Sequence, residues 1–291
     1  MAQLSGGSSA CPLCGAAGRL YVEAFGDALH RCGSCGLIYL FPHPDQAEMV
    51  RRHQSKEYAL HPYFAAGDDA AATRNGFGLH RWFLSLLAPH VGRGSRVLDV
   101  GAGTGDFAES ASTVYRMSAV EPSPFLAERI RRRGAYDVFE GAFEDFSPAD
   151  PYDAVLLMDM IEHAADPRRL LRHVREVLRP GGILFVCTVD SRALLYGLGR
   201  ILGRVSHISK TAHYLVHRVY CQQHNWYFNR AALGQVVGEA GFTVLDHQGY
   251  EFPLDRLREN PAVVAGLRGV YAVQRLLGAN TEQYLIARSP A

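Results

Sequence analysis

The sequence predicts an α/β fold in which a mainly parallel sheet, covered by helices, follows a small cysteine-rich module. Two observations predict it. From Ser95 onward, short apolar runs alternate with stretches of helical periodicity, which is the pattern of βαβ units. Before that point, residues 11–40 carry two Cys-x-x-Cys pairs. The chain has 291 residues, which suits one large domain with a smaller appendage, because domains commonly have about 100–200 residues.

The composition is that of a globular protein, with 48% hydrophobic and 20% charged residues, and it excludes disorder over most of the chain. Lys plus Arg is 30 and Asp plus Glu is 29, so the net charge of +1 disfavours a strongly basic nucleic-acid binder or a polybasic membrane protein. A local cluster of basic residues is still compatible with this net charge. No apolar run approaches the roughly 18 residues that span a bilayer. Residues 1–10 lack the apolar core of a signal peptide, so we expect a cytoplasmic protein without a membrane partner.

The N-terminal part is predicted to be a disordered tail over residues 1–10 and a zinc ribbon over residues 11–45. Cys11 and Cys14 form one pair, Cys32 and Cys35 the other, and 17 residues separate the pairs. This spacing is typical of zinc sites, and four thiolates form a closed tetrahedral site, which indicates structural rather than catalytic zinc. So short a segment needs a metal to fold. Redox-active dithiols are the rival interpretation.

Residues 46–90 are expected to form a helical connector or cap, and residues 91–291 the main domain. The first strand is predicted at Arg96–Val100 and the second ends at Glu121. The helix after it begins with Ser123 as N-cap and Pro124 at its first position, and Gly134 ends it. The remaining strands are expected at 136–139, 154–158, 183–189, 242–245 and 283–287, and further helices at 79–87, 168–178, 230–240 and 256–277, the last within a helical insertion at 254–278.

The sequence VLDVGAGTG at residues 97–105 is the most informative motif of the main domain. A buried strand ends in alternating glycines, and glycine is required where the backbone approaches a ligand closely or has positive φ. The third glycine comes one residue too early for the dinucleotide fingerprint. Asp99 could receive the ammonium group of an amino-acid-like cofactor. Glu121 lies at the end of the second strand, 22 residues later, where a carboxylate can accept ribose hydroxyls.

With these motifs the chain resembles the class I S-adenosylmethionine (SAM)-dependent methyltransferases over about residues 75–290. The resemblance rests on VLDVGAGTG, on Glu121-Pro122, on YDAVLLMDMIEHAADP at 152–167 and on LRPGGILFV at 178–186. The Glu162-His163 dipeptide is similar to the ubiquinone-pathway and natural-product O-methyltransferase branch. The resemblance implies a Rossmann-like seven-stranded sheet whose final strand is antiparallel, with SAM across the C-terminal strand ends.

The resemblance also implies which residues bind SAM. The methionine part would lie beside Asp99, the loop residues Gly101, Ala102 and Gly103, and Met158. The ribose would be held by Glu121, followed by Pro122, and the adenine would lie near Phe143 and Glu144. Relatives often carry an acid where this chain has Ala142, so adenine recognition could shift to backbone amides or to Glu144.

Methyl transfer to a hydroxyl group requires removal of a proton, for which a base with a pKa near neutrality is suited. His163 lies just past the fourth predicted strand and is the main candidate for a general base. Asp190, at the end of the fifth strand, could also reach the cleft or could be a turn residue. The alternative for His163 is that it caps or packs against the following helix.

Residues 191–228 are expected to form an irregular lid and acceptor pocket, rich in His and aromatic residues. Candidate substrate contacts there are His213, Tyr214, His217 and Trp226. The sequence after the second cysteine pair, GLIYLFPHP, is similar to zinc-ribbon-bearing methyltransferases of sugar and secondary-metabolite pathways, whose ribbon helps cover the acceptor pocket. By that likeness Tyr39, His43 and Tyr63 could contact the substrate. Interface packing is the alternative for each of these residues.

We therefore expect a methyltransferase for a small-molecule acceptor, with O-methylation as the leading reaction, acting as a monomer or homodimer. The first alternative is an rRNA base methyltransferase whose ribbon binds RNA. The clustered Arg129, Arg131, Arg132 and Arg133 could then bind phosphate, although they also suit the C-terminal end of a helix. A further alternative is a SAM-binding protein that does not transfer methyl groups, such as a cyclase, or a ribbon that only binds a partner.

Overall fold

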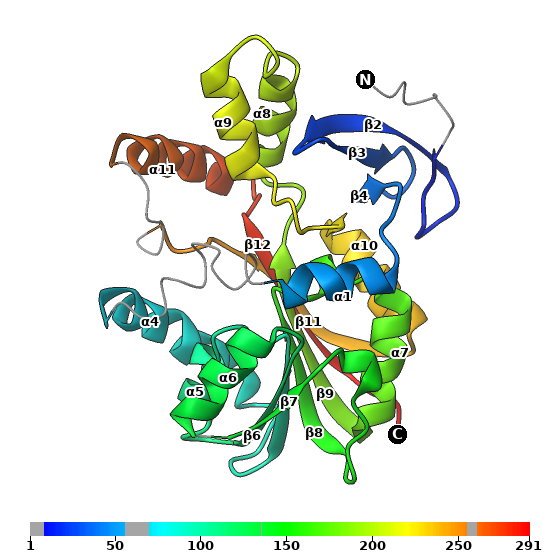
Figure 1. Cartoon of the computed structure of the whole chain (residues 1–291), viewed down its shortest axis with the longest axis vertical. Coiled ribbons are helices and arrows are strands. Elements are labelled where there is room, and N and C mark those ends of the chain that lie inside the picture. Colours follow the sequence, from blue (N-terminus) through cyan, green and yellow to red (C-terminus); the bar gives the residue numbers. More distant parts are fainter. Residues whose placement is uncertain (1–8, 56–69, 135, 255–260) are drawn as a thin grey trace.

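The computed structural model describes residues 9–55, 70–134, 136–254 and 261–291. Its main sheet has seven strands in the order β11-β12-β9-β8-β5-β6-β7 (Figure 1). Strand β12 runs antiparallel to both of its neighbours, β11 and β9, and the other pairings of this sheet are parallel. The arrangement confirms the predicted α/β sheet with an antiparallel final strand. The bounds are β5 Arg96–Val100, β6 Arg116–Glu121, β7 Asp137–Glu140, β8 Tyr152–Met158, β9 Leu178–Val189, β11 Thr243–Tyr250 and β12 Glu282–Arg288.

Alternating residues of the central strands pack on opposite faces of the sheet, because side chains in a strand alternate with a period of two. Leu98 and Val100 belong to the core formed with helices α7 (Pro167–Val177) and α10 (Arg230–Glu239). Val97 packs in the other core, with α4 (Ala70–Leu87) and α5 (Asp106–Ala111). Helix α6 (Pro124–Arg133) lies against β6 and β7.

A second sheet is formed by the cysteine-rich module together with a distant strand. Its order is β1-β2-β3-β4-β10, with β1 Ser9–Ala10, β2 Ala17–Ala24, β3 Asp27–Cys32, β4 Ile38–Phe41 and β10 Trp226–Tyr227. All its pairings are antiparallel. The sheet begins at Ser9, inside the segment expected as a tail, and residues 1–8 lie outside the described residues. Strand β10 joins the module to the main domain by pairing with β4.

The expectation that residues 191–228 are irregular is wrong. They contain helices α8 (Leu194–Gly203) and α9 (Lys210–Val219) before β10. The physical reason is tertiary: Tyr196 of α8 and Val216 of α9 are buried against ribbon residues such as Val22 and Leu40. Without that partner surface, the many polar and aromatic residues of this segment give no clear helical period.

Four further elements lie in the described part of the chain. Helix α1 (Gln46–Gln54) lies between the ribbon and the main sheet in Figure 1, and Asp45 caps it by accepting a hydrogen bond from the Glu48 amide at 2.7 Å. Helix α11 (Pro261–Leu276) falls within the predicted helical insertion. Two short 3-10 turns, η2 (Phe143–Asp145) and η3 (Ile161–His163), follow β7 and β8 at the end of the sheet where parallel α/β folds bind ligands.

Candidate functional site

A cavity lies at the C-terminal ends of β5, β6 and β8, and helix α1 covers it. From the sheet side it is lined by Val100, Gly101, Val120, Glu121, Pro122, Ala142, Phe143, Glu144, Asp159, Met160, His163, Ala164 and Ala165, and from α1 by Gln46, Met49, Val50 and His53.

Glycine is required at the turn between β5 and α5. Gly101 has φ +73°, and a Cβ atom there would lie 2.9 Å from Cγ of Met160. Its amide donates to the Val120 carbonyl at 2.8 Å. The bare backbone therefore allows Met160 to close one wall of the cavity. Asp159, immediately before Met160, has φ +50°, a strained conformation of the kind that clusters at functional sites.

Two buried carboxyl groups lie under the glycine loop. Asp99 is 3% exposed, and burial raises its pKa to about 7. Glu121 accepts hydrogen bonds from the amides of Gly103 and Ser123, each at 2.8 Å. Burial nevertheless raises the pKa of Glu121 to about 7, because the two amides oppose the rise more weakly and the neighbouring Asp99 adds to it. Both carboxyls would be stabilised in the charged form by hydrogen-bond donors or a cation brought by a ligand.

Most predicted cofactor-binding residues come together at this cavity. Gly101, Glu121, Pro122, Phe143 and Glu144 line it. Asp99, Ala102 and Gly103 belong to the same strand and loop but are not among the lining residues.

Met158 lies differently from the expectation. It packs with the core on the α4 and α5 side of the sheet, because it shares the strand face of Ala154 and Leu156. Asp159 and Met160 line the cavity in its place.

His163 lines the cavity and has a defined tautomer. Its Nδ1 lies 2.9 Å from the Gln223 carbonyl oxygen, which can only accept, so Nδ1 carries the proton and Nε2 is left as an acceptor in the neutral ring. Burial, followed by the nearby His224 and His53, lowers the pKa of His163 well below its usual value. At neutral pH the imidazole is therefore uncharged and can accept a proton at Nε2, but as a weaker base than the expected one with a pKa near neutrality.

A group of buried acids and histidines adjoins His163. Glu162 is fully buried, and neither of its carboxylate oxygens has a hydrogen-bond partner among the described residues. Burial raises its pKa to about 7, with His224 opposing the rise. The ligand atoms of Glu162, His163 and His224 lie within 4.8 Å of one another, so this group could hold a cation or share a proton. Burial also raises the pKa of Glu282 well above its usual value.

Asn225, just before β10, and Trp226, at its start, form hydrogen bonds with the turn that contains His163. The Asn225 amide donates to the Glu162 carbonyl at 2.8 Å, and the Asn225 side chain donates to the His163 carbonyl at 3.0 Å. Trp226 Nε1 donates to the Ala164 carbonyl at 2.6 Å. On its other side, Asn225 accepts at 2.8 Å from the amide of Leu40 in ribbon strand β4. The ribbon is thus connected by hydrogen bonds to the backbone of the candidate base.

Asp190, the second candidate for catalysis, is buried at the end of β9 but is not a lining residue. It accepts from the Arg192 amide at 2.9 Å and lies 3.6 Å from Nε of Arg230. Burial raises its pKa, and these two neighbours oppose the rise. Its contacts are those of a residue that fixes the turn into α8.

The predicted substrate residues lie away from the cavity lining. Tyr39 and Trp226 are buried where ribbon and main domain meet, and His43 stacks on Trp226 with ring centroids 4.5 Å apart. His213, Tyr214 and His217 lie on α9, where His217 accepts a hydrogen bond from the Phe25 amide of the ribbon. Tyr63 lies outside the described residues.

The sequence reasoning missed the wall formed by α1, which includes Met49 and His53. The capping pair Asp45 and Glu48 is a local signal for this helix. His224 had no signal of its own, since its place beside Glu162 depends on the path of the lid.

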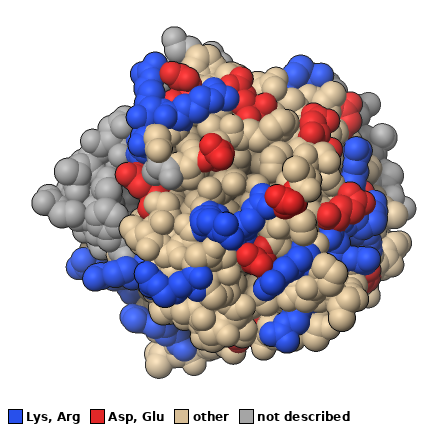
Figure 2. All heavy atoms as spheres, turned by 90° about the horizontal axis from the view of Figure 1, so that it is seen from below, with Lys and Arg blue, Asp and Glu red and all other residues tan. Residues whose placement is uncertain are grey.

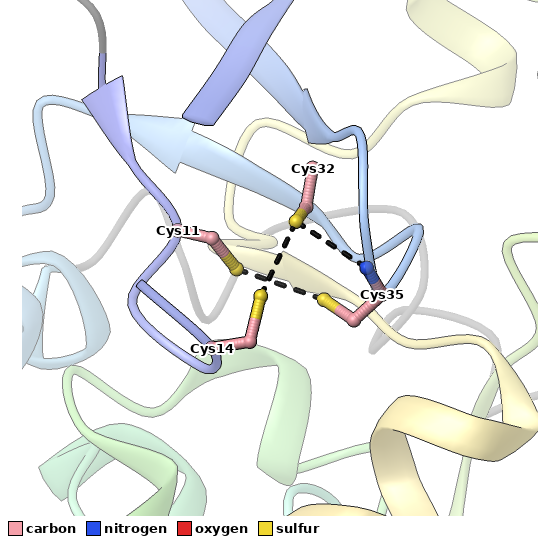
Figure 3. Close-up of side chains that lie close together, drawn as sticks. All are labelled: Cys11, Cys14, Cys32 and Cys35. Atoms are coloured by element: carbon pink, nitrogen blue, oxygen red, sulfur yellow. Dashed lines mark hydrogen bonds between the residues drawn. The ribbon is translucent and has the colours of Figure 1, made fainter. Parts of the chain in front are cut away.

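The four predicted zinc ligands come together in the ribbon. All four sulfur atoms point to one place (Figure 3). Sγ of Cys11 lies 3.7 Å from that of Cys35, and Sγ of Cys14 lies 3.4 Å from that of Cys32. The edge of a tetrahedron with Zn–S bonds of about 2.3 Å is close to 3.8 Å. The amides of Ser34 and Cys35 also point at the Cys32 sulfur, so this donor set could hold a tetrahedral metal.

The arginines that could have bound RNA phosphates are paired within the protein. Arg131 contacts Glu140 at 2.8 Å, Arg132 contacts Glu128 at 3.1 Å, and Arg133 contacts Asp106 at 2.6 Å. Figure 2 shows Lys and Arg interspersed with Asp and Glu on the face seen from below. In the part of the chain that the structure describes, no helix is both long and apolar enough to cross a bilayer.

Comparisons with known proteins agree with this geometry. A family model described as a methyltransferase domain matches residues 74–247. A ubiquinone biosynthesis O-methyltransferase of Neisseria meningitidis serogroup C is 30% identical over 177 residues, which cover 55% of this chain and 68% of the relative. A ubiquinone biosynthesis O-methyltransferase of Xanthomonas oryzae is 32% identical over 130 residues, 39% of this chain, and the match spans 54% of that relative's length.

Solved structures show the same fold at lower identity. The [4+2]-cyclase SpnF has a TM-score of 0.50 and 20% identity, with 73% of this chain and 81% of that chain covered. The phosphoethanolamine N-methyltransferase 2 of Haemonchus contortus, in complex with SAM, has a TM-score of 0.50 and 17% identity, with 74% and 53% covered. At these identities the likeness shows the fold alone.

Proposed function

Because the chain belongs to the class I SAM-dependent methyltransferases, we propose that it methylates an oxygen atom of a small-molecule acceptor, with His163 as the general base. The observation that carries this proposal is the hydrogen bond from Nδ1 of His163 to the Gln223 carbonyl. It leaves Nε2 of a neutral imidazole in the wall of the cavity. The ubiquinone-pathway relatives support an O-directed reaction on a small acceptor.

The cavity is suited to SAM. We assign the ammonium group to Asp99, the ribose hydroxyls to Glu121 and the adenine to the walls around Phe143 and Glu144. Three features support this: two buried carboxyls with raised pKa values, a glycine at positive φ, and an apolar wall beside them. When bound, SAM supplies an electrophilic methyl group, so the protein has mainly to position the acceptor and remove its proton.

His163 would accept the acceptor's hydroxyl proton at Nε2. Its lowered pKa keeps the ring neutral at pH 7, so no proton has to leave before the acceptor binds. The Gln223 carbonyl holds Nδ1–H and stabilises the imidazolium that forms. The buried Glu162 lies beside it, and in its ionised form would favour that positive charge.

For the ribbon we propose a structural zinc ion held by Cys11, Cys14, Cys32 and Cys35. The sulfur positions and the amides that face Cys32 support it. Through β4 and β10 the metal would maintain the hydrogen bonds that hold the His163 turn. The RNA alternative has less support, since the arginines of α6 are paired with carboxylates.

The test uses SAM labelled on its methyl group. The full chain is incubated with an extract of cells that express it, and the labelled products are separated by size and by RNase sensitivity. Label in a small, RNase-resistant compound is the expected result, and label in RNase-sensitive material would overturn the proposal. With the purified acceptor, His163→Gln should lower kcat by roughly 10²–10⁴-fold and leave the Kd of SAM unchanged. His207→Gln, at an exposed lid position, is the matched control.

A further inference from the structure

A hollow lies where the ribbon meets the turn between β9 and α8. The ribbon lines it with Tyr21 of β2, Arg31 of β3 and Gly36, and the main domain lines it with Ser191, Arg192 and the first residues of α8. Helix α8 packs against β2, so the hollow joins segments more than 150 residues apart in the chain (Figure 1). It is separate from the cavity assigned to SAM, because the two share no lining residue. We call it the junction hollow.

The charged side chains that line the junction hollow are all positive. Arg31 comes from the ribbon side and Arg192 from the main domain, and no Asp or Glu is among the lining residues. Neither arginine forms an ion pair within the described part of the chain, whereas arginines of α6 are paired with carboxylates. Asp190, the acid nearest to Arg192 in sequence, is buried and lies 3.6 Å from the guanidinium of Arg230. The hollow therefore concentrates positive charge that no lining carboxylate neutralises.

The surroundings position the guanidinium group on the ribbon side. Arg31 lies over the ring of Tyr21 at 5.9 Å, and Arg200 of α8 lies over the same ring at 5.0 Å. The Tyr21 hydroxyl donates to a backbone carbonyl of α8 at 3.3 Å, which fixes the ring between the ribbon and the helix. Gly36 leaves space beside Arg31, since a Cβ atom there would lie 3.8 Å from Nη2 of Arg31 and 3.0 Å from Nδ2 of Asn229. A planar guanidinium held in this way presents its N–H groups in a fixed geometry.

We propose that the junction hollow binds the phosphoryl group of a small, water-soluble molecule. Two guanidinium groups without a carboxylate match a group with about two negative charges and three acceptor oxygens. The Ser191 hydroxyl belongs to the same lining and can donate a further hydrogen bond. A carboxylate has two oxygens and one charge, so it would leave one of the two arginines without a partner.

The bound phosphoryl group would connect the ribbon to the main domain, because one arginine comes from each. It belongs either to the acceptor or to a separate effector molecule. The site itself does not depend on which acceptor is methylated.

The experiment measures binding of inorganic pyrophosphate to the full chain by isothermal titration calorimetry in about 150 mM salt. The parent should bind with a Kd below about 1 mM, and the double variant Arg31→Gln, Arg192→Gln should bind at least about tenfold more weakly. Arg19→Gln with Arg204→Gln removes the same charge at two exposed positions outside the lining, so this matched control should bind like the parent. SAM binding by each variant shows that it is folded.

A second measurement identifies the source of the phosphoryl group. Pyrophosphate is added to the assay with labelled SAM and cell extract. Inhibition of the parent that Arg31→Gln with Arg192→Gln does not show would support the site and assign the phosphoryl group to the acceptor. An uninhibited parent that still binds pyrophosphate would support the site and assign the group to a separate molecule.

Two results of the calorimetry would overturn the proposal. A parent chain that does not bind pyrophosphate has no such site. An equal loss of affinity in the two double variants would show that only the net positive charge attracts the anion.

Discussion

The affinity for SAM should depend on pH through Asp99. The perturbation is a change from pH 7.0 to pH 5.5, a range in which the ammonium group of the cofactor stays protonated. Burial raises the pKa of Asp99 to about 7, and a cation bound beside it would lower that pKa again. Protons and SAM therefore compete for the same carboxylate, so affinity should rise as pH rises.

The size of the effect follows from the ionised fraction. With a pKa of about 7, Asp99 is about half ionised at pH 7.0 and about 3% ionised at pH 5.5. The Kd for SAM should then be about 16-fold higher at pH 5.5, or about 1.6 kcal/mol weaker binding. Glu121 has a pKa of about 7 as well, so about 16-fold is a lower bound for the parent chain.

The assay is isothermal titration calorimetry of SAM in buffers with different ionisation enthalpies. At pH 5.5 each binding event should release at least about one proton, and at pH 7.0 about half a proton from Asp99. Asp99→Asn should bind SAM weakly and lose this part of the pH dependence, while Glu121→Gln keeps it. A Kd that stays within about twofold from pH 5.5 to 7.0 would refute the assignment of Asp99 to the ammonium group.

Three further perturbations test other parts of the site. Gly101→Ala places a side chain at φ +73° and against Met160. The free energy of unfolding in urea should therefore fall by about 1–2 kcal/mol, and SAM should bind less tightly. An unchanged unfolding curve would contradict the expected backbone strain at residue 101. Asn225→Ala removes side-chain hydrogen bonds to the turn of His163. The free energy of unfolding should therefore fall by about 1–3 kcal/mol, and kcat should fall while the Kd for SAM stays unchanged. A normal kcat would show that the turn keeps its position without the Asn225 side chain. Mass spectrometry should find one zinc ion in the parent chain, and Cys14→Ser should lose this ion and melt at a lower temperature. A parent chain that contains no metal and melts at the same temperature as Cys14→Ser would exclude the structural site.

Several features could be read from the sequence because local physical chemistry fixes them. Strand β5 was predicted at its observed bounds, since a continuous apolar run ends in glycines that only a sharp turn accommodates. Helix α6 was also predicted at its bounds, from Pro124 at its start and Gly134, with φ +66°, at its end. The two cysteine pairs come together as their spacing indicated.

Other features arise only when distant segments meet. The strand period could not tell which face Met158 would take relative to the cavity, so Asp159 and Met160 replace it there. The helices of residues 191–228 are stabilised by a ribbon surface more than 150 residues earlier in the chain. The same holds for Trp226, expected near substrate, whose pairing with Tyr39 makes it part of an interface.

The sequence by itself determined the class of the fold, the glycine loop with its two acids, and the four cysteines, because each depends on residues near one another in the chain. The tertiary structure decided the tautomer of His163, the cavity wall that α1 forms and the proximity of Glu162 to His224. These depend on how the lid packs between the ribbon and the sheet. No local pattern specifies that packing, because the buried surface that stabilises it belongs to three separate parts of the chain.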